Sequence, residues 1–292
     1  MKTVNTHPAS RPDILEDITR FYDEATVDYA YWSERMNMHY GYLKHWKQFF
    51  KREDMLEQLT REVADRLQLT NDNHILDLGC GTGASARTMT ELDSTVHVTG
   101  VNVVASHVEQ GKALNRTHMG RSRMNLLHAD YHHVPLPNAV ADGAFAMESM
   151  CHSYNKNLWL QEAHRLLKPG ARLVITDCFL RNPHKPMNKL SKWAYNRFRI
   201  NWSVPHLAEI RLFEDMAKEV GFQEVKVEDV RWRVAPSVFH SPFVVGRFLW
   251  NRLIRRKHNG EQTVKNLKAV LLSIILGLDR RNFSYYIVTL TR

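Results

Sequence analysis

One apolar stretch that runs directly into a glycine-rich turn limits what this chain can fold into. Residues 74–83 read HILDLGCGTG, and the helical sequence ASARTMTEL follows. Gly79, Gly81 and Gly83 let the backbone turn sharply and lie close to a ligand, where any Cβ atom would collide. A buried strand, a tight turn and a helix in this order are typical of the ligand-binding edge of an α/β sheet. The turn is therefore the first candidate binding site.

The spacing of these glycines separates the turn from two phosphate-binding motifs. A dinucleotide-binding turn has the pattern GxGxxG with an acidic residue about 20 residues later, and a P-loop has Lys-Ser/Thr after its last glycine. The turn here reads GxGxG and is followed by Ala84 and Ser85. Both phosphate-binding interpretations are therefore disfavoured.

Short apolar runs alternate with amphipathic stretches along the chain. This alternation predicts one enlarged α/β domain in which helices cover both faces of a seven-stranded, mostly parallel sheet. Apolar residues at three- and four-residue spacing predict a helix over 158–167, which Pro169 and Gly170 end. The expected strands are 74–79, 96–103, 124–129, 143–148, 172–179, 224–230 and 283–290.

The turn and three later segments together resemble a known family. DLGCGTG resembles the first motif of class I, or seven-stranded, S-adenosylmethionine-dependent methyltransferases. HADYHHVPLP (128–137) resembles their third strand with its Asp and Leu-Pro, and DGAFAMESMCH (142–152) resembles their fourth strand. EAHRLLKPGARLVITDCF (162–179) resembles the helix, Lys-Pro-Gly turn and fifth strand that follow. The resemblance covers residues 70–180 well and implies a Rossmann-like fold with S-adenosylmethionine as cofactor.

The resemblance assigns the methionine part of the cofactor to the turn. Gly79, Gly81 and Gly83 would admit it, and Asp77 would orient the turn and hold the amino group. This assignment suits a sulfonium ligand, which carries a fixed positive charge and no phosphate.

The resemblance also implies contacts with the adenosine part. Asp130 would accept a hydrogen bond from the adenine amino group, with Tyr131 alongside the ring; a helix cap is the alternative role for Asp130. The second strand ends in Asn102, where the family usually has an acid that holds both ribose hydroxyls. An amide can still donate to and accept from a diol, so Asn102 is the ribose candidate.

The sequence GVN at 100–102 resembles a subset of the family. Sterol C-methyltransferases, cyclopropane fatty acid synthases, geranyl diphosphate C-methyltransferases and some glycoside or amine methyltransferases have a similar turn there. This resemblance favours a small, largely apolar acceptor such as an isoprenoid, lipid, polyketide or quinone-like molecule.

Aromatic residues before the core resemble the amino-terminal segment of tocopherol, sterol and related methyltransferases, in FYD (21–23) and NMHYGY (37–42). In that group the segment folds over the cofactor and excludes water. Tyr22 and Tyr40 are the implied cofactor contacts; the alternative is an amphipathic helix whose rings pack on the core. The candidates for a substrate lid, from here and from a later basic stretch, are Tyr31, Trp32, Tyr42, Trp193 and Trp202.

The end of the fourth strand carries the candidates for chemistry. Glu148 resembles the glutamate at this strand end in sterol C-methyltransferases, where the carboxylate faces the reacting centre. Glu148 would stabilise the positive charge that develops when an alkene attacks the methyl group. For an oxygen or nitrogen acceptor, His152 or His39 would act as general base. C-methylation is slightly favoured, and O- or N-methylation is the alternative.

We divide the chain into four parts that this resemblance implies. They are a helical N-terminal lid (1–70), the SAM-binding core (71–180), a basic, aromatic cap insertion (181–223) and a C-terminal part with a helical insertion that completes the sheet (224–292). The run at 267–278 is too short to cross a bilayer, which needs roughly 20 apolar residues, and is expected to form a buried helix.

The net charge of +9 comes partly from basic runs at 181–203 and 247–258, which contain no acid. Such runs suit a solvated face, a membrane surface or a phosphorylated substrate; nucleic acid is the less favoured partner, and an RNA methyltransferase the less favoured enzyme. The amino terminus has no signal-peptide pattern, so we expect a cytoplasmic protein, and the basic runs are the candidates for peripheral membrane contact. No spacing among 3 Cys and 16 His predicts a metal site, and the sequence leaves the oligomeric state open.

Overall fold

The computed structural model describes residues 11–181, 186–254 and 261–292. Within these ranges it describes every side chain except those of 11–13, 25–31, 251–254 and 261–262. The seven strands are β1 (His74–Leu78), β2 (His97–Asn102), β3 (Met124–His128), β4 (Ala141–Met147), β5 (Leu167–Leu180), β6 (Glu224–Asp229) and β7 (Phe283–Thr291).

All seven predicted strands are present in one sheet, in the order β3-β2-β1-β4-β5-β7-β6. Only β7 runs antiparallel, between β5 and β6, so the sheet is mostly parallel as expected. The largest difference in length is at β5, which starts at Leu167 because that residue already pairs with Ala141. The α/β class and the Rossmann-like arrangement predicted from sequence are confirmed.

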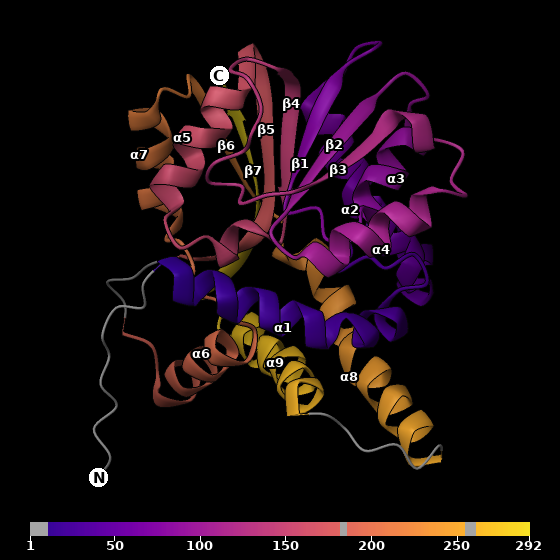
Figure 1. The fold of residues 1–292 in the computed structure, drawn as a ribbon. Coiled ribbons are helices and arrows are strands. Elements are labelled where there is room, and N and C mark those ends of the chain that lie inside the picture. The colour runs from indigo at the N-terminus through magenta and orange to yellow at the C-terminus, as the bar shows by residue number, and fades with distance from the viewer. Residues whose placement is uncertain (1–10, 182–185, 255–260) are drawn as a thin grey trace.

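Helices cover both faces of the sheet, as predicted (Figure 1). On one face, α2 and α3 pack on Ile75, Phe145 and Val174. On the other, α5 and α7 pack on Leu173 and Ile175. The helices of these layers are α2 (Arg52–Leu67), α3 (Ala84–Leu92), α4 (Ala105–Asn115), α5 (Lys156–Leu166) and α7 (Ile210–Val220).

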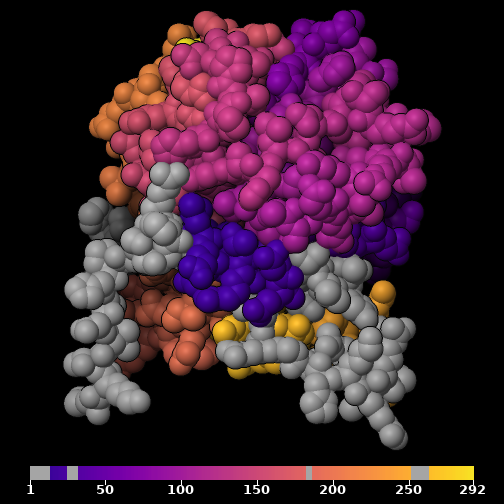
Figure 2. All heavy atoms as spheres, viewed as in Figure 1, coloured from indigo at the N-terminus to yellow at the C-terminus, as the bar shows by residue number. Residues whose placement is uncertain are grey.

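A second group of helices gathers below the carboxyl ends of the parallel strands. They are α1 (Arg11–Trp32), α6 (Lys189–Asn201), α8 (Arg231–Ile254) and α9 (Glu261–Leu278). Figure 2 shows α1 lying across the molecule between the sheet layers and the other helices of this group. The segment 181–223 therefore supplies both a helix below the sheet, α6, and a helix of the sheet layers, α7.

The run at 267–278 lies in α9 and is buried on one side only. Ala269, Leu272 and Leu276 face inward, whereas Leu271 and Leu278 are exposed. The expectation of a buried helix is thus correct for one face of α9, and the other face is exposed to solvent. No helix among the described residues is long and apolar enough to span a bilayer.

Candidate functional site

Two adjoining cavities lie between the sheet and the helices below it. The smaller, of about 80 Å³, lies at the ends of β1, β2 and β4 beneath α1. The larger, of about 230 Å³, is enclosed mainly by apolar side chains of α1, α6, α8 and α9. Five residues line both cavities: Tyr22, Met38, His39, Glu148 and His152. A group transferred from one cavity to the other would pass these five side chains.

The glycine turn forms one wall of the smaller cavity. Gly79 has φ +101°, and a Cβ atom there would lie 2.3 Å from Cβ of Ser149. At Gly81, with φ +52°, it would lie 3.1 Å from Sδ of Met38. Glycine is thus required for both its conformation and its size. Gly83, with φ +76°, precedes α3, and the first residues of that helix, Ala84 and Ser85, also line the cavity.

Asp77 supplies a buried carboxyl group with an unsatisfied oxygen to the same cavity. The side chain is buried, and its Oδ2 atom has no hydrogen-bond partner among the described residues. Burial raises the pKa of this carboxyl to about 8. A buried carboxylate without a partner is costly, and a ligand ammonium group would supply both the missing donor and the missing charge. The cavity therefore fits the amino-acid end of S-adenosylmethionine.

The predicted adenosine contacts line this cavity too. Nδ2 of Asn102 lies 3.4 Å from the Gly81 carbonyl oxygen, so the amide is held beside the turn. Asp130 accepts at Oδ1 from the backbone N–H of His132 at 2.9 Å and is 2.6 Å from Nδ1 of the same residue. The hydroxyl of Tyr131 donates to the Ser149 carbonyl at 3.0 Å. Asp130 thus stabilises its own turn and lines the cavity; no helix begins there, so it is not a helix cap, and its contact with adenine stays a prediction.

Glu148 lies in the wall between the cavities, in a left-handed backbone conformation with φ +49°. Its Oε1 accepts from the backbone N–H of Tyr40 at 2.7 Å and from the hydroxyl of Tyr285 at 2.8 Å. Burial raises the pKa of this carboxyl to about 8, although both hydrogen bonds lower it. A non-glycine residue in this conformation stores strain, which is typical of functional sites.

His39 lies in the same wall and is 5% exposed. Its Nδ1 is 2.7 Å from the Tyr40 carbonyl oxygen, and because a carbonyl can only accept, Nδ1 carries the proton. Burial lowers the pKa of the imidazole to about 4, so the ring is neutral at physiological pH. Nε2 then has a lone pair, and it is buried without a hydrogen-bond partner among the described residues.

His152 differs from His39 in that both ring nitrogens have partners. Nδ1 donates to the Ser203 carbonyl at 3.3 Å, and Nε2 accepts from the hydroxyl of Tyr22 at 2.9 Å. Burial lowers the pKa of His152 to about 4. The Tyr22 ring also packs edge-on against His107 at 5.4 Å. His152 therefore holds α1 over the smaller cavity.

The other aromatic candidates lie in different places. Trp32, Tyr40 and Trp202 line the larger cavity, where the Tyr40 hydroxyl bonds Ser273 at 2.8 Å. Tyr40, a predicted cofactor contact, therefore lines the larger cavity and not the smaller one. Tyr42 packs in the core and lines neither cavity. Trp193 is 52% exposed on α6 and likewise lines neither, whereas Tyr31 is among the residues whose side chains are not described.

Sequence reasoning missed most of the larger cavity and one buried histidine. Many of the cavity's walls come from α8 and α9, including Val234, Val238, Val270 and Ile274. The apolar periodicity of these helices predicts buried faces but not a cavity between them. His107 lines the smaller cavity and lies five residues after Asn102, a position that only the strand-to-helix connection could have suggested. The described residues contain no group of His, Cys, Asp or Glu that could hold a metal ion.

Comparison with known proteins gives the same assignment. Residues 76–175 match the family described as a methyltransferase domain. The chain is 33% identical to the O-methyltransferase resE of Aspergillus sclerotiorum over 202 residues, which are 68% of this chain and 73% of resE. The chain belongs to the S-adenosylmethionine-dependent methyltransferases. This methyltransferase is also 27% identical to the cycloartenol-C-24-methyltransferase of Arabidopsis thaliana, over 85% of this chain and 78% of that one.

Solved structures show that the fold of this methyltransferase is shared widely. The cyclopropane synthase MmaA2 of Mycobacterium tuberculosis superposes with a TM-score of 0.83 at 14% identity, over 95% of this chain and 98% of that chain. The cyclase SpnF superposes with a TM-score of 0.78 at 21% identity, over 94% of each chain. The geranyl diphosphate C-methyltransferase of Streptomyces coelicolor A3(2) superposes at 0.74 and 16% identity, over 98% and 99%. At these identities the likeness concerns the fold.

Proposed function

We propose that this methyltransferase methylates an oxygen atom of a small, largely apolar acceptor, with His39 as the general base. The observation that carries the proposal is Nε2 of His39, a buried lone pair without a partner among the described residues, in the wall shared by both cavities. The smaller cavity would hold S-adenosylmethionine and the larger one the acceptor. Resemblance to resE, whose name describes an O-methyltransferase, supports this proposal.

The reaction is an in-line displacement at the methyl carbon. Bound S-adenosylmethionine supplies the electrophilic methyl group; the new bond joins acceptor oxygen to methyl carbon, and the electron pair of the broken bond stays on sulfur. The acceptor proton passes to Nε2 of His39. General-base catalysis requires this nitrogen to lie within hydrogen-bond distance of the acceptor hydroxyl. Holding the two reactants aligned in adjoining cavities is itself worth up to about 7–11 kcal/mol.

Charge in the wall explains how a histidine with so low a pKa can accept a proton. The site holds one positive charge before transfer, on the bound ligand, and one afterwards, on the protonated His39. Glu148 lines the same wall and would be ionised by either charge, since a nearby cation lowers a carboxyl pKa. Glu148 thus stabilises the transfer, while its hydrogen bonds from Tyr40 and Tyr285 fix its position.

C-methylation is the second candidate, and it rests on the same carboxylate. In that reaction an alkene carbon takes the methyl group and Glu148 stabilises the carbocation, with no base needed for the transfer itself. Resemblance to a cycloartenol-C-24-methyltransferase supports it. The two candidates differ in their dependence on His39.

The test compares His39→Ala and Glu148→Gln with the unaltered protein on phenolic and isoprenoid acceptors. O-methylation predicts that His39→Ala lowers kcat about 100-fold or more while S-adenosylmethionine affinity changes less than about threefold. Raising the pH should restore activity in His39→Ala, because the phenol then ionises without a base. Mass analysis of the products identifies the methylated atom.

His152→Ala is the matched control, because it removes a second buried histidine of the same wall. It should weaken cofactor binding by loosening Tyr22 but should show no recovery at high pH. If His39→Ala keeps full activity and Glu148→Gln loses it, the reaction is the C-methylation candidate. Product methylated on carbon would lead to the same conclusion.

A further inference from the structure

Helix α8 carries a stripe of exposed aromatic side chains. Trp232, Phe239, Phe243 and Trp250 recur at spacings of seven, four and seven residues. At 100° per residue they fall within an arc of about 40° on one side of the helix. Phe243 is 79% exposed and Trp250 63%. The opposite side of α8 is buried, so this helix is apolar on two faces, of which one faces solvent.

The 3₁₀ helix η1 (Trp46–Phe50) extends this exposed aromatic face. It contacts the first half of α8 at Phe49, whose ring centre lies 5.3 Å from that of His240. Arg233 of α8 also donates to the carbonyl of Leu43, which precedes η1. Trp46 is 71% exposed and Phe50 77%. We name the set the aromatic surface: Trp46 and Phe50 of η1 with Trp232, Phe239, Phe243 and Trp250 of α8. Clusters of exposed large apolar side chains are typical of interaction sites.

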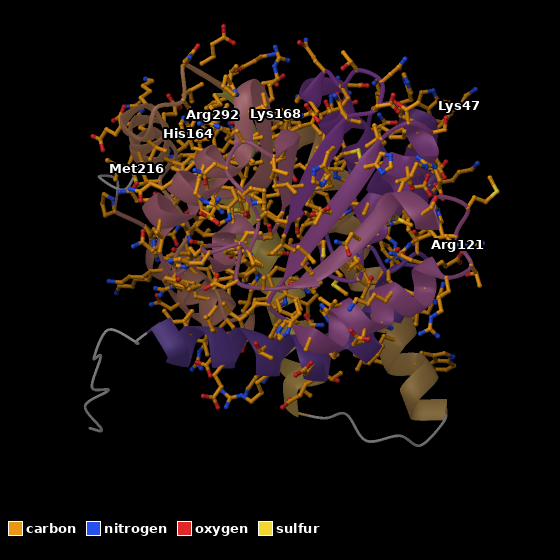
Figure 3. The ribbon with its side chains drawn as sticks, turned by 45° about the horizontal axis from the view of Figure 1, so that its top comes forward. Lys47, Arg121, His164, Lys168, Met216 and Arg292 are labelled. Carbon is orange, nitrogen blue, oxygen red and sulfur yellow. The ribbon has the colours of Figure 1, made fainter. Side chains whose placement is uncertain are left out.

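Positive charge accompanies the aromatic surface. Residues 43–52 and 231–254 each contain four Lys/Arg and no Asp or Glu. Arg247 follows Phe243 by four residues, so it lies beside the stripe on α8, and it is exposed. Lys47 projects from the body into solvent (Figure 3). Neither Lys47 nor Arg247 forms an ion pair within the described part of the chain.

The aromatic surface is continuous with the mouth of the larger cavity. Trp232 and Phe239 belong to the stripe, and both also line that cavity. We propose that the aromatic surface docks on an anionic lipid bilayer and lets an apolar acceptor pass between bilayer and cavity. Aromatic rings in the interface and cations near anionic headgroups are the two contributions that hold peripheral proteins there. The docking rests on the surface alone, and the passage of acceptor rests on the proposed function.

The positive charge around the aromatic surface favours a bilayer over a second copy of this chain as its partner. Pairing two aromatic surfaces would bring two acid-free segments together, with Lys47 and Arg247 facing like charges. Like charges across an interface are unfavourable, whereas an anionic bilayer complements them.

The experiment measures binding to vesicles without acceptor or cofactor. We compare vesicles of phosphatidylcholine alone with vesicles containing 30 mol% phosphatidylglycerol, by co-sedimentation and by the tryptophan fluorescence shift. The unaltered protein should bind the anionic vesicles and release on adding salt. Phe243→Ala/Trp250→Ala should lower the partition coefficient about tenfold or more, and Lys47→Glu/Arg247→Glu should lower it similarly.

Matched controls lie elsewhere on the molecule. Trp193→Ala removes another exposed tryptophan, from α6, and Arg116→Glu/Arg121→Glu reverses two exposed cations beyond α4. Both controls should bind within about twofold of the unaltered protein. Equal loss in the charge controls would mean attraction by net charge alone and would overturn the proposal. No binding to either vesicle overturns it as well, and a dimer that Phe243→Ala/Trp250→Ala dissociates would identify the surface as a self-interface.

A kinetic comparison then separates this proposal from the proposed function. With acceptor dispersed in water, Phe243→Ala/Trp250→Ala should turn over at the normal rate, because neither side chain lines a cavity. With acceptor carried in anionic vesicles the same variant should be slower by about the loss in partition. If no acceptor is ever methylated the proposed function fails, while the vesicle-binding result stands unchanged.

Discussion

The two cavities meet at one wall but are built in different ways. The smaller cavity is formed by strand ends and tight turns, and it contains the buried Oδ2 atom of Asp77, which has no partner among the described residues. The larger cavity is formed mainly by side chains of helices, and most of its lining is aliphatic or aromatic. One site is specified by local conformation and the other by packing between distant segments.

This difference implies different tolerances to change. A rigid turn that must place several hydrogen-bond donors and acceptors loses its ligand when one atom is added, because the backbone has no alternative position. A cavity between helices changes its volume when a side chain is trimmed, and the ligand loses contact area in proportion. We therefore expect substitutions in the smaller cavity to have the larger effects.

The largest effect is expected for Gly79→Ala. The added Cβ would lie 2.3 Å from Cβ of Ser149 at φ +101°, so the turn must move. S-adenosylmethionine affinity should fall by about 100-fold or more, as measured by calorimetric titration. Gly170→Ala is the control, because its φ is +79° but nothing lies within 4 Å of the new Cβ. It should cost about 1–2 kcal/mol of stability and leave cofactor affinity unchanged; equal binding by both variants would contradict the role of the turn.

The next effect concerns the proton on Asp77. With a pKa of about 8 this carboxyl is mostly protonated at pH 7 in the free protein, and an ammonium ligand would ionise it. Cofactor binding at pH 7 should therefore release protons, and affinity should rise with pH and level off above about 8. Asp77→Asn should lower affinity about 10- to 100-fold and reduce the release.

Calorimetry in two buffers of different ionisation enthalpy measures this proton release. Glu148→Gln is the control, because that carboxyl also has a pKa of about 8 but lies on the wall toward the larger cavity. It should reduce the release while keeping affinity within a few-fold. Unchanged release in Asp77→Asn would show that this carboxyl does not meet the ligand ammonium.

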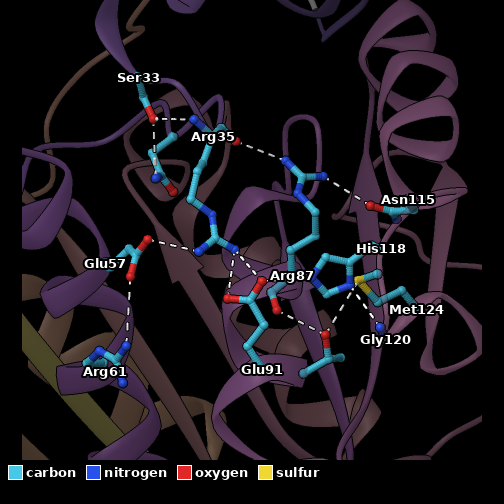
Figure 4. A network of polar contacts seen from close by, with 12 residues as sticks. Ser33, Arg35, Glu57, Arg61, Arg87, Glu91, Asn115, His118, Gly120 and Met124 are labelled. Carbon is cyan, nitrogen blue, oxygen red and sulfur yellow. Dashed lines mark hydrogen bonds and ion pairs between the residues drawn. The ribbon is translucent and has the colours of Figure 1, made fainter.

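A smaller effect is expected at Arg87, which supports the turn from behind. This buried arginine donates to the Thr82 carbonyl at 2.8 Å, to Asn115 Oδ1 at 3.0 Å and to the Arg35 carbonyl at 3.0 Å. Figure 4 shows it joining Asn115 to Arg35, whose own guanidinium pairs with Glu57 and Glu91. Arg87→Ala should weaken cofactor binding about tenfold, because the glycine turn loses the hydrogen bond that fixes its position.

Arg123→Ala separates this positioning role from general destabilisation. Arg123 also binds backbone carbonyls nearby, those of Thr90, Asp93 and Val96, but none of them belongs to the turn. Both variants should melt at lower temperature, because buried carbonyls lose donors worth about 1–3 kcal/mol each. Only Arg87→Ala should change cofactor affinity, and a similar change in Arg123→Ala would refute the specific role.

The same contrast explains what could be predicted from sequence. The seven strands and the glycine turn follow from patterns within ten consecutive residues, and the structure contains all of them. Arg87 could have been noticed as the single cation of the helix ASARTMTEL, although its partners come from three separate segments. The free Nε2 of His39 depends on a hydrogen bond to the Tyr40 carbonyl, which fixes the tautomer and has no sequence signature.

The larger cavity is the hardest feature to predict from sequence, since the residues that enclose it are separated by up to 264 positions, from Phe21 to Tyr285. Apolar periodicity in α8 and α9 predicts that each helix has a buried side, but it does not say whether the two sides touch or leave space. The regular spacing of the aromatic stripe of α8 can be seen in the sequence. Which apolar face of this helix is exposed to solvent depends on how the helix packs in the structure.

The smallest predicted effect is also the sharpest test of the comparison. Ile274 of α9 lines the larger cavity, and the adjacent Ile275 is also half-buried but packs on the helix cluster instead. Ile274→Ala should raise the KM for the acceptor about three- to tenfold, because partial burial of lost methylenes is worth about 1 kcal/mol, and should leave cofactor affinity within twofold. Ile275→Ala should lower the melting temperature without changing KM. If instead Ile274→Ala weakens cofactor binding as much as acceptor binding, the two cavities act as one site, and the division between a rigid cofactor turn and a packed acceptor cavity is wrong.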